Sequence, residues 1–180
     1  MIESIWQPRF QQTIFRQLVD AFSRPGHIIG LPGCNNNAML AVLATLTDGG
    51  SSMADPHKCL EKADWLRLQL EEHSPDLAAF IACHGCKPPD FEPNTGTLAS
   101  PEHGATLVIS VDTLSGGEKQ YQLTGPGIEA IQEIAPKGLN ISWFQQRETW
   151  NGAFPLGVDM VLTAAGSVLA LPRTTHIKEI

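Results

Sequence analysis

The residues best suited to chemistry lie near the end of the sequence, in the stretch LPRTTH. An arginine, two hydroxyl side chains and a histidine follow one another there: Arg173, Thr174, Thr175 and His176. An arginine fork flanked by hydroxyls is suitable chemistry for a phosphate oxygen. The four residues are therefore candidates for a ligand site or an interface.

The preceding text, FPLGVDMVLTAAGSVLAL, predicts the hairpin that positions these residues. If its loop is 164–166, with glycine in the left-handed position, Asp159 pairs with Leu171 and Gly157 with Arg173. Asp159 and Arg173 then lie within reach of a salt bridge. Two interpretations stay open. The open end of the hairpin is a polar site that includes Gly157 and Asp159, or the ion pair fastens the hairpin and an exposed tail follows.

A second motif, CHGC, spans Cys83 to Cys86. One such pair supplies two of the four ligands of a structural zinc site, and no second pair stands at the required spacing. A redox pair would use a following helix N-terminus, but Pro88 and Pro89 come almost at once. The motif is interpreted as a partly buried strand end without a metal.

A third motif, GPGIEA at 125–130, fits the dinucleotide pattern G-x-G-x-x-A. The strand before it alternates in polarity, and Arg147 and Glu148 stand where the acidic residue of a nucleotide fold should follow. A glycine turn between a strand and a helix is the preferred interpretation. The sequence contains no G-x-S-x-G, H-E-x-x-H or Walker phosphate-loop pattern, so no catalytic residue is assigned.

Helices and strands alternate along the chain. Helices are predicted at 9–22, 58–72, 127–134 and 141–150, with a further one that starts at N-caps among Asn35 to Asn37 and runs to about Thr45. Strands are predicted at 27–31, 78–83, 105–111, 119–124, 158–163 and 167–171, and a proline-rich loop at 87–100. This order favours a layered α/β fold with a mixed sheet, and residues 1–180 are expected to form a single domain.

The composition excludes some classes of partner. The formal net charge is −7, and the few lysines and arginines are scattered, which argues against a nucleic-acid or anionic membrane surface. No apolar run approaches the roughly 18 residues of a membrane span, and no secretory signal stands at the start. Four cysteines in 180 residues do not suggest a disulfide framework. A reduced, cytoplasmic protein is expected.

Three blocks of the sequence resemble one family. They are FRQLVDAFSRPGHI (15–28), HGATLVISVDTLSGGEKQYQLTGPGIE (103–129) and FPLGVDMVLTAAGSVLALPRTTHIK (154–178). All three resemble PhnH, the H-subunit family of the bacterial carbon-phosphorus lyase. CHGC is not a motif of this family, and the segment 50–100 resembles it only loosely.

The resemblance implies a three-layer α/β/α sandwich with a mixed sheet, similar to the large domain of pyridoxal-phosphate transferases but without that cofactor. It implies a homodimer that joins the G, I and J subunits. That core complex transfers an alkylphosphonate to the ribose C1 of ATP and releases adenine, giving α-D-ribose 1-methylphosphonate 5-triphosphate. The carbon-phosphorus bond is cleaved later, by an iron-sulfur radical subunit. No independent activity is implied for the H subunit, and Gly125 and Gly127 take a structural role.

Three hypotheses follow. The first is a scaffold subunit whose polar C-terminal hairpin serves assembly or a neighbouring active site. The second is an autonomous enzyme or binding protein for a small phosphonate or phosphate anion, held at Arg173, Thr174, Thr175 and His176. The third, a pyridoxal-phosphate enzyme, needs a Schiff-base lysine in a cofactor pocket, and no lysine of this sequence has that context.

Overall fold

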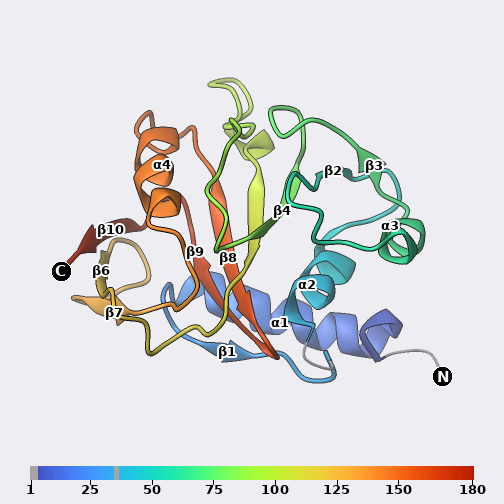
Figure 1. The fold of residues 1–180 in the computed structure, drawn as a ribbon, viewed down its shortest axis with the longest axis horizontal. Coiled ribbons are helices and arrows are strands. Elements are labelled where there is room, and N and C mark those ends of the chain that lie inside the picture. The colour runs from blue at the N-terminus through green and yellow to red at the C-terminus, as the bar shows by residue number, and fades with distance from the viewer. Residues whose placement is uncertain (1–3, 35–36) are drawn as a thin grey trace.

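The computed structural model describes residues 4–34 and 37–180, so the predicted N-caps Asn35 and Asn36 lie outside the described residues. The helices are η1 (Ser4–Trp6), α1 (Pro8–Ser23), α2 (Ala38–Leu46), α3 (Lys62–Leu68), η2 (Pro101–His103) and α4 (Ser142–Trp150). The strands are β1 (Ile29–Gly30), β2 (Ser52–Ala54), β3 (Glu71–Glu72), β4 (Phe80–His84), β5 (Thr106–Ser110), β6 (Tyr121–Thr124), β7 (Gln132–Ile134), β8 (Asp159–Ala164), β9 (Ser167–Leu171) and β10 (His176–Glu179). Figure 1 shows their arrangement.

A mixed sheet forms the centre of the molecule. In the described part of the chain it has seven strands, in the order β1-β9-β8-β5-β4-β2-β3. The strands β3, β2, β4, β5 and β8 run parallel to their neighbours, whereas β9 is antiparallel to β8 and β1 antiparallel to β9. A separate antiparallel sheet has the order β10-β6-β7. The predicted α/β class with a mixed sheet is confirmed.

The central strands are buried on both faces, which explains why they are almost wholly apolar. Alternate residues of β5 point to opposite sides: Val108 belongs to one hydrophobic cluster, and Leu107 and Ile109 belong to the other. In the same way, β8 places Val161 in the first cluster and Met160 in the second. Each of these strands therefore contributes side chains to the hydrophobic clusters on both faces of the sheet.

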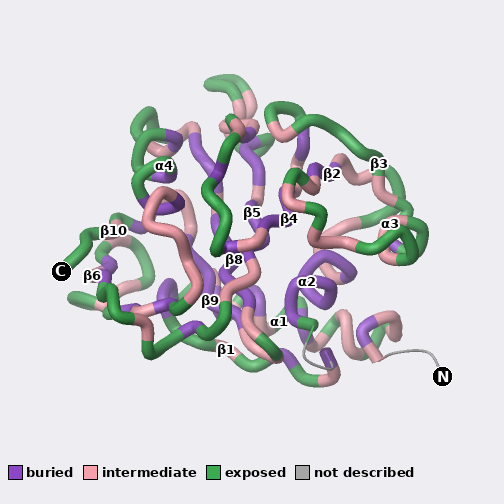
Figure 2. Tube along the Cα trace, viewed as in Figure 1, coloured by how far each residue is buried: buried purple, intermediate pink, exposed green. Residues whose placement is uncertain are grey.

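Different elements cover the two faces. One cluster packs the sheet against η1, α1 and α2, of which α1 and α2 lie next to each other in the lower part of Figure 1. The other packs it against α4 and the small sheet, which lie at the left of the same view beside the C-terminus. Figure 2 shows the buried residues concentrated along the central strands and the inner sides of these elements. This second outer layer is therefore part helix and part β-sheet.

Local sequence explains the two helices on the first face. α1 starts at a proline in its first turn, and Ile14, Leu18 and Ala21 form its buried side. α2 is apolar almost throughout and buried, and its N-cap Asn37 accepts a hydrogen bond from the Leu40 amide at 3.1 Å. No helix among the described residues has the length and apolarity needed to cross a membrane.

The helix predicted at 58–72 is shorter in the structure. The Asp55 carboxylate accepts hydrogen bonds from the amides of Cys59 and Leu60, at 2.7 and 2.9 Å, and so stabilises a turn where the helix was expected to start. At the other end Gln69 adopts a left-handed conformation with φ 53°, which ends α3. The last two residues of the predicted helix form the edge strand β3 instead.

The helix predicted at 127–134 is wrong. Gly125 and Gly127 both have positive φ, 129° and 82°, and they turn the chain back on itself. Residues 132–134 then pair with β6 in antiparallel register as β7. GPGIEA therefore joins two strands, and the strand-to-helix corner expected from its sequence is not formed.

The C-terminal hairpin is confirmed, but its predicted register is one residue off. Ala164 pairs with Ser167, so the loop has two residues, and Ala165 takes the positive φ of 46°. Consequently Met160, and not Asp159, pairs with Leu171. The carbonyls of the loop accept hydrogen bonds from the amides of Leu31 and Ala38, so contacts distant in sequence hold this tighter turn.

Candidate functional site

The segment after β9 carries the chain from the large sheet to the small one. It turns within 172–175, where the Thr175 amide donates to the Pro172 carbonyl at 2.9 Å. His176 then opens β10, which pairs with β6 from the His176–Thr124 pair onward. The C-terminal stretch is therefore an ordered link between two sheets, although most of its side chains from His176 onward are exposed.

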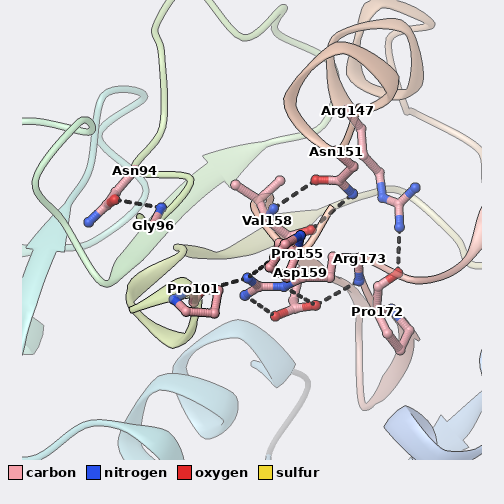
Figure 3. A network of polar contacts seen from close by, with 10 residues as sticks. All are labelled: Asn94, Gly96, Pro101, Arg147, Asn151, Pro155, Val158, Asp159, Pro172 and Arg173. Atoms are coloured by element: carbon pink, nitrogen blue, oxygen red, sulfur yellow. Dashed lines mark hydrogen bonds and ion pairs between the residues drawn. The ribbon is translucent and has the colours of Figure 1, made fainter. Parts of the chain in front are cut away.

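Arg173 lies at the centre of this link and forms the ion pair predicted with Asp159 (Figure 3). Its Nη2 is 2.8 Å from Asp159 Oδ2, and its backbone N–H donates to Oδ1 at 2.7 Å. Its Nη1 donates to the Pro101 carbonyl at 2.7 Å and is 3.4 Å from the Pro155 carbonyl. The side chains of Arg173 and Asp159 are only 15% and 22% exposed. The guanidinium thus connects three segments of the protein and is largely occupied by internal partners.

Gly157 allows the loops around this ion pair to approach closely. It has φ 144°, and a Cβ at its position would lie 2.4 Å from Asn151 Oδ1. The Asn151 side chain accepts from the Val158 amide at 2.7 Å and donates to its carbonyl at 3.2 Å (Figure 3). Any side chain at Gly157 would displace the group that fixes the start of β8.

Arg147 is the charged residue of this region that sequence reasoning did not single out. It projects from α4, and its Nη1 and Nη2 donate to the carbonyls of Thr175 and Pro172, at 2.9 and 2.5 Å. Burial lowers the pKa of Arg147 to about 10, which the charge of Asp159 partly opposes, so the side chain stays charged at neutral pH. Its spacing from Trp143 and Trp150 on one helix face was the available signal, since such an arginine points inward.

The predicted residues thus come together only in part. Gly157, Asp159 and Arg173 lie in one network, and Thr175 is buried beside Arg147. Thr174 is half-buried at the turn, and its carbonyl is 2.7 Å from where a Cβ of Gly125 would stand. His176 is exposed. The hydroxyls and the histidine do not converge on the Arg173 guanidinium.

A pocket of about 430 Å³ lies between α4 and this turn. Its walls include four of the polar residues just described and two aromatic rings, namely Arg147, Arg173, Thr175, His176, Phe144 and Phe154. A volume of this size suits a small organic ligand. The pocket is therefore the place where the C-terminal polar residues could meet a molecule from outside.

The CHGC motif lies elsewhere, at the carboxyl end of β4. Cys83 is buried and Cys86 exposed, and both are free thiols. Burial raises the pKa of Cys83, and burial together with Asp55 raises that of Cys59 to about 12, so neither is a ready thiolate. Across the described residues, no three His, Cys, Asp or Glu side chains gather closely enough to hold a metal ion.

Comparison with known proteins shows which family the sequence matches. Residues 4–178 match the family described as "Bacterial phosphonate metabolism protein (PhnH)". HtxG of Stutzerimonas stutzeri, described as a candidate C-P lyase subunit protein, is 42% identical over 96% of this chain and 88% of its own length. A Rhizobium meliloti (strain 1021) protein named alpha-D-ribose 1-methylphosphonate 5-triphosphate synthase subunit PhnH is 33% identical over 93% of this chain and 90% of its own.

Proposed function

Because the chain belongs to the PhnH family of bacterial phosphonate metabolism proteins, we propose that it is a subunit of a carbon-phosphorus lyase core complex. In that complex it supports the transfer of an alkylphosphonate to the ribose C1 of ATP, with release of adenine. The observation that carries this proposal is the family match, which extends over almost the whole chain. The named activity of the Rhizobium meliloti relative supports the choice of reaction.

The geometry of the C-terminal segment suits a non-catalytic subunit of the complex. Arg173 and Asp159 direct most of their hydrogen bonds to each other and to nearby backbone groups. Such a network holds loops in fixed positions, which suits a surface that partner subunits recognise. We expect the purified chain to have no activity by itself.

The proposed assembly contains a homodimer of this chain together with G, I and J subunits, in the cytoplasm. We also propose that residues 1–180 are one domain whose layers resemble the large domain of pyridoxal-phosphate transferases without the cofactor. Superposition on a solved transferase of that type tests the fold, and light scattering of the purified chain tests the dimer.

Co-expression tests the function directly. The tagged chain is produced with the G, I and J subunits of the same source, and the eluted complex is analysed for fixed stoichiometry. We expect all four chains to elute together, and the complex to convert ATP and methylphosphonate to adenine and the ribosyl phosphonate. Elution of the chain by itself, or the same conversion by the purified chain without partners, would contradict the proposal.

A second candidate function is the binding of a small phosphonate or phosphate anion by this chain alone. The pocket beside the C-terminal turn favours it, because Arg173, Thr175 and His176 all line that pocket. Thr174 stands at the same turn but not in its walls. Internal partners occupy the Arg173 guanidinium, so another residue of the pocket would have to contact the anion.

A further inference from the structure

Two basic side chains line the more buried part of the pocket between α4 and the β9–β10 turn. Two guanidinium groups, of Arg147 and Arg173, line it, and Asp159 is the one carboxylate that pairs with either among the described residues. That carboxylate is bound to Arg173, and Arg147 has only backbone carbonyls as hydrogen-bond partners. Glu148 also lines the pocket but is exposed, so water screens its charge. A buried cation without a paired anion is costly, and an entering anion would relieve that cost.

Two buried polar atoms of the pocket residues have no hydrogen-bond partner in the protein. They are Arg147 Nε and Thr175 Oγ1. The two residues are only 3% and 2% exposed. A buried donor or hydroxyl without a partner is costly, so a bound group that supplies the partner would stabilise it. Both residues line the same pocket, so one ligand could supply partners to both if the two side chains reorient toward it.

The remaining walls indicate what kind of anion fits. Phe144 is almost fully buried, whereas Phe154 is 70% exposed, so the pocket has one aromatic residue beside the buried Arg147 and Thr175 and another at its outer part. Inorganic phosphate has no apolar part to place against the aromatic rings of the pocket. An oxyanion with an organic substituent would place its oxygens at the guanidinium and its substituent against the rings.

We propose that this pocket binds a small organic oxyanion of the phosphonate or phosphate-ester class, with Arg147 and Thr175 as the residues that contact its oxygens. Arg173 stabilises the turn and pairs with Asp159, so Arg147 is the arginine that contacts the ligand. The choice of a phosphonate rests on the proposed function, whereas the presence of two arginines and two aromatic rings in the pocket does not.

Calorimetric titration of the purified full chain tests this assignment. Methylphosphonate, inorganic phosphate and acetate are each titrated into the parent, Arg147→Met, Thr175→Val and Arg16→Met. Arg16 is an exposed arginine of α1 and serves as the matched control for loss of one positive charge. We expect saturable binding of methylphosphonate by the parent and by Arg16→Met. We expect Arg147→Met to bind at least about tenfold more weakly, as befits the loss of a charge-assisted hydrogen bond.

Thr175→Val keeps the side-chain volume and removes only the hydroxyl, so it tests the site even if Arg147→Met fails to fold. We expect it to bind methylphosphonate several-fold more weakly than the parent. Lack of saturable binding by the parent overturns the proposal, as does parental affinity in both site variants. Equal affinity for acetate or for inorganic phosphate overturns the class of ligand.

The outcome is separable from that of the proposed function. Arg147→Met is also co-expressed with the G, I and J subunits. A parent that assembles with them but binds no phosphonate contradicts this inference alone. A parent that binds phosphonate through Arg147 but does not assemble contradicts the proposed function alone.

Discussion

Two arginines near one turn are stabilised in different ways. Arg173 has a carboxylate partner, and Asp159 meets both its side chain and its backbone amide. Arg147 is more deeply buried and is bound through the carbonyls of Thr175 and Pro172. The first arrangement fixes the end of the hairpin, and the second ties that end to α4. Removing the charge of Arg173 should therefore affect the end of the hairpin, and removing that of Arg147 should affect its contact with α4.

Loss of the Asp159 charge should destabilise the fold. Asp159→Asn leaves the Arg173 guanidinium partly buried without a counter-ion, and we expect the free energy of unfolding to fall by about 2 to 3 kcal/mol, below the 3 to 5 of a fully buried pair. Urea denaturation measures this. The control is Glu179→Gln in the exposed Lys119–Glu179 pair, for which we expect no measurable change. An equal effect of the two substitutions would show that burial does not strengthen the Arg173 pair.

His57 should make the stability depend on pH. Burial lowers its pKa, the charge of Lys87 lowers it further, and its Nδ1 accepts a hydrogen bond from the His84 amide. The folded state therefore binds the proton less tightly than the unfolded state, whose histidine pKa is about 6.5. As pH falls through that value the unfolded state takes up the proton first, so stability decreases, and the contribution is fully present at higher pH.

The measurement is an NMR titration of the His57 ring, whose midpoint should lie below 6.5. In urea denaturation, His57→Gln should show a weaker loss of stability than the parent between about pH 6.5 and 5. A ring midpoint above 6.5, or the same loss in both proteins, would falsify the assignment.

At the scale of elements, the glycine turn decides how the small sheet meets the first helix. A Cβ at Gly127 would stand 2.5 Å from the Ser23 carbonyl, at the end of α1, and 2.8 Å from Pro25 Cδ. A Cβ at Gly125 would stand 2.7 Å from the Thr174 carbonyl. The two glycines thus let the β6–β7 connection pack against the end of α1 and against the turn between β9 and β10.

Gly127→Ala and Gly116→Ala form a matched pair for testing this contact. Both glycines have a similar positive φ, 82° and 78°, but a Cβ at Gly116 would meet nothing within 4 Å. Both substitutions cost the strain of a left-handed alanine, of order 1 kcal/mol. We expect Gly127→Ala to lose clearly more stability in thermal denaturation because the backbone must also shift. Equal losses would mean that conformation alone matters at this turn.

The last strand should be an integral part of the fold. β10 pairs with β6 over four residues, and Ile177 packs against the second hydrophobic cluster. Removal of 176–180 should therefore lower the melting temperature and speed the hydrogen exchange of the β6 amides, while the amides of β2 should change little. Unchanged exchange in β6 would indicate a tail that only rests on the surface.

At the scale of the whole molecule, both hydrophobic clusters share the strands of one sheet. Leu107 and Val108 are neighbours in β5 but belong to opposite clusters, so neither layer can leave without exposing the sheet. We expect a single cooperative unfolding transition for 1–180, in keeping with the proposed single domain. Circular dichroism reports all helices. Tryptophan fluorescence reports Trp143 and Trp150 in the second cluster together with Trp6 and Trp65, which pack against the first. Non-coincident transitions would contradict the prediction.

The family, the first helix and the central strands could be predicted from the sequence alone. The apolar spacing of Ile14 and Leu18 fixed the first helix, and the unbroken apolar run around Val108 fixed a buried central strand. The Asp159–Arg173 pair was also predictable, because a hairpin brings its two strand ends together under any nearby register. In each case the information lies within a few residues, where periodicity and turn chemistry act.

Only the tertiary structure decided what surrounds the polar residues 173–176. The position of Arg147 beneath Thr175, the pairing of β10 with β6 and the conversion of 132–134 to a strand all depend on which elements the central sheet brings side by side. Those contacts join residues far apart in sequence, and their free energy comes from shared burial rather than local propensity. For that reason Arg173 of the hairpin could be recognised from the sequence, whereas the role of Arg147 on α4 could be seen only in the fold.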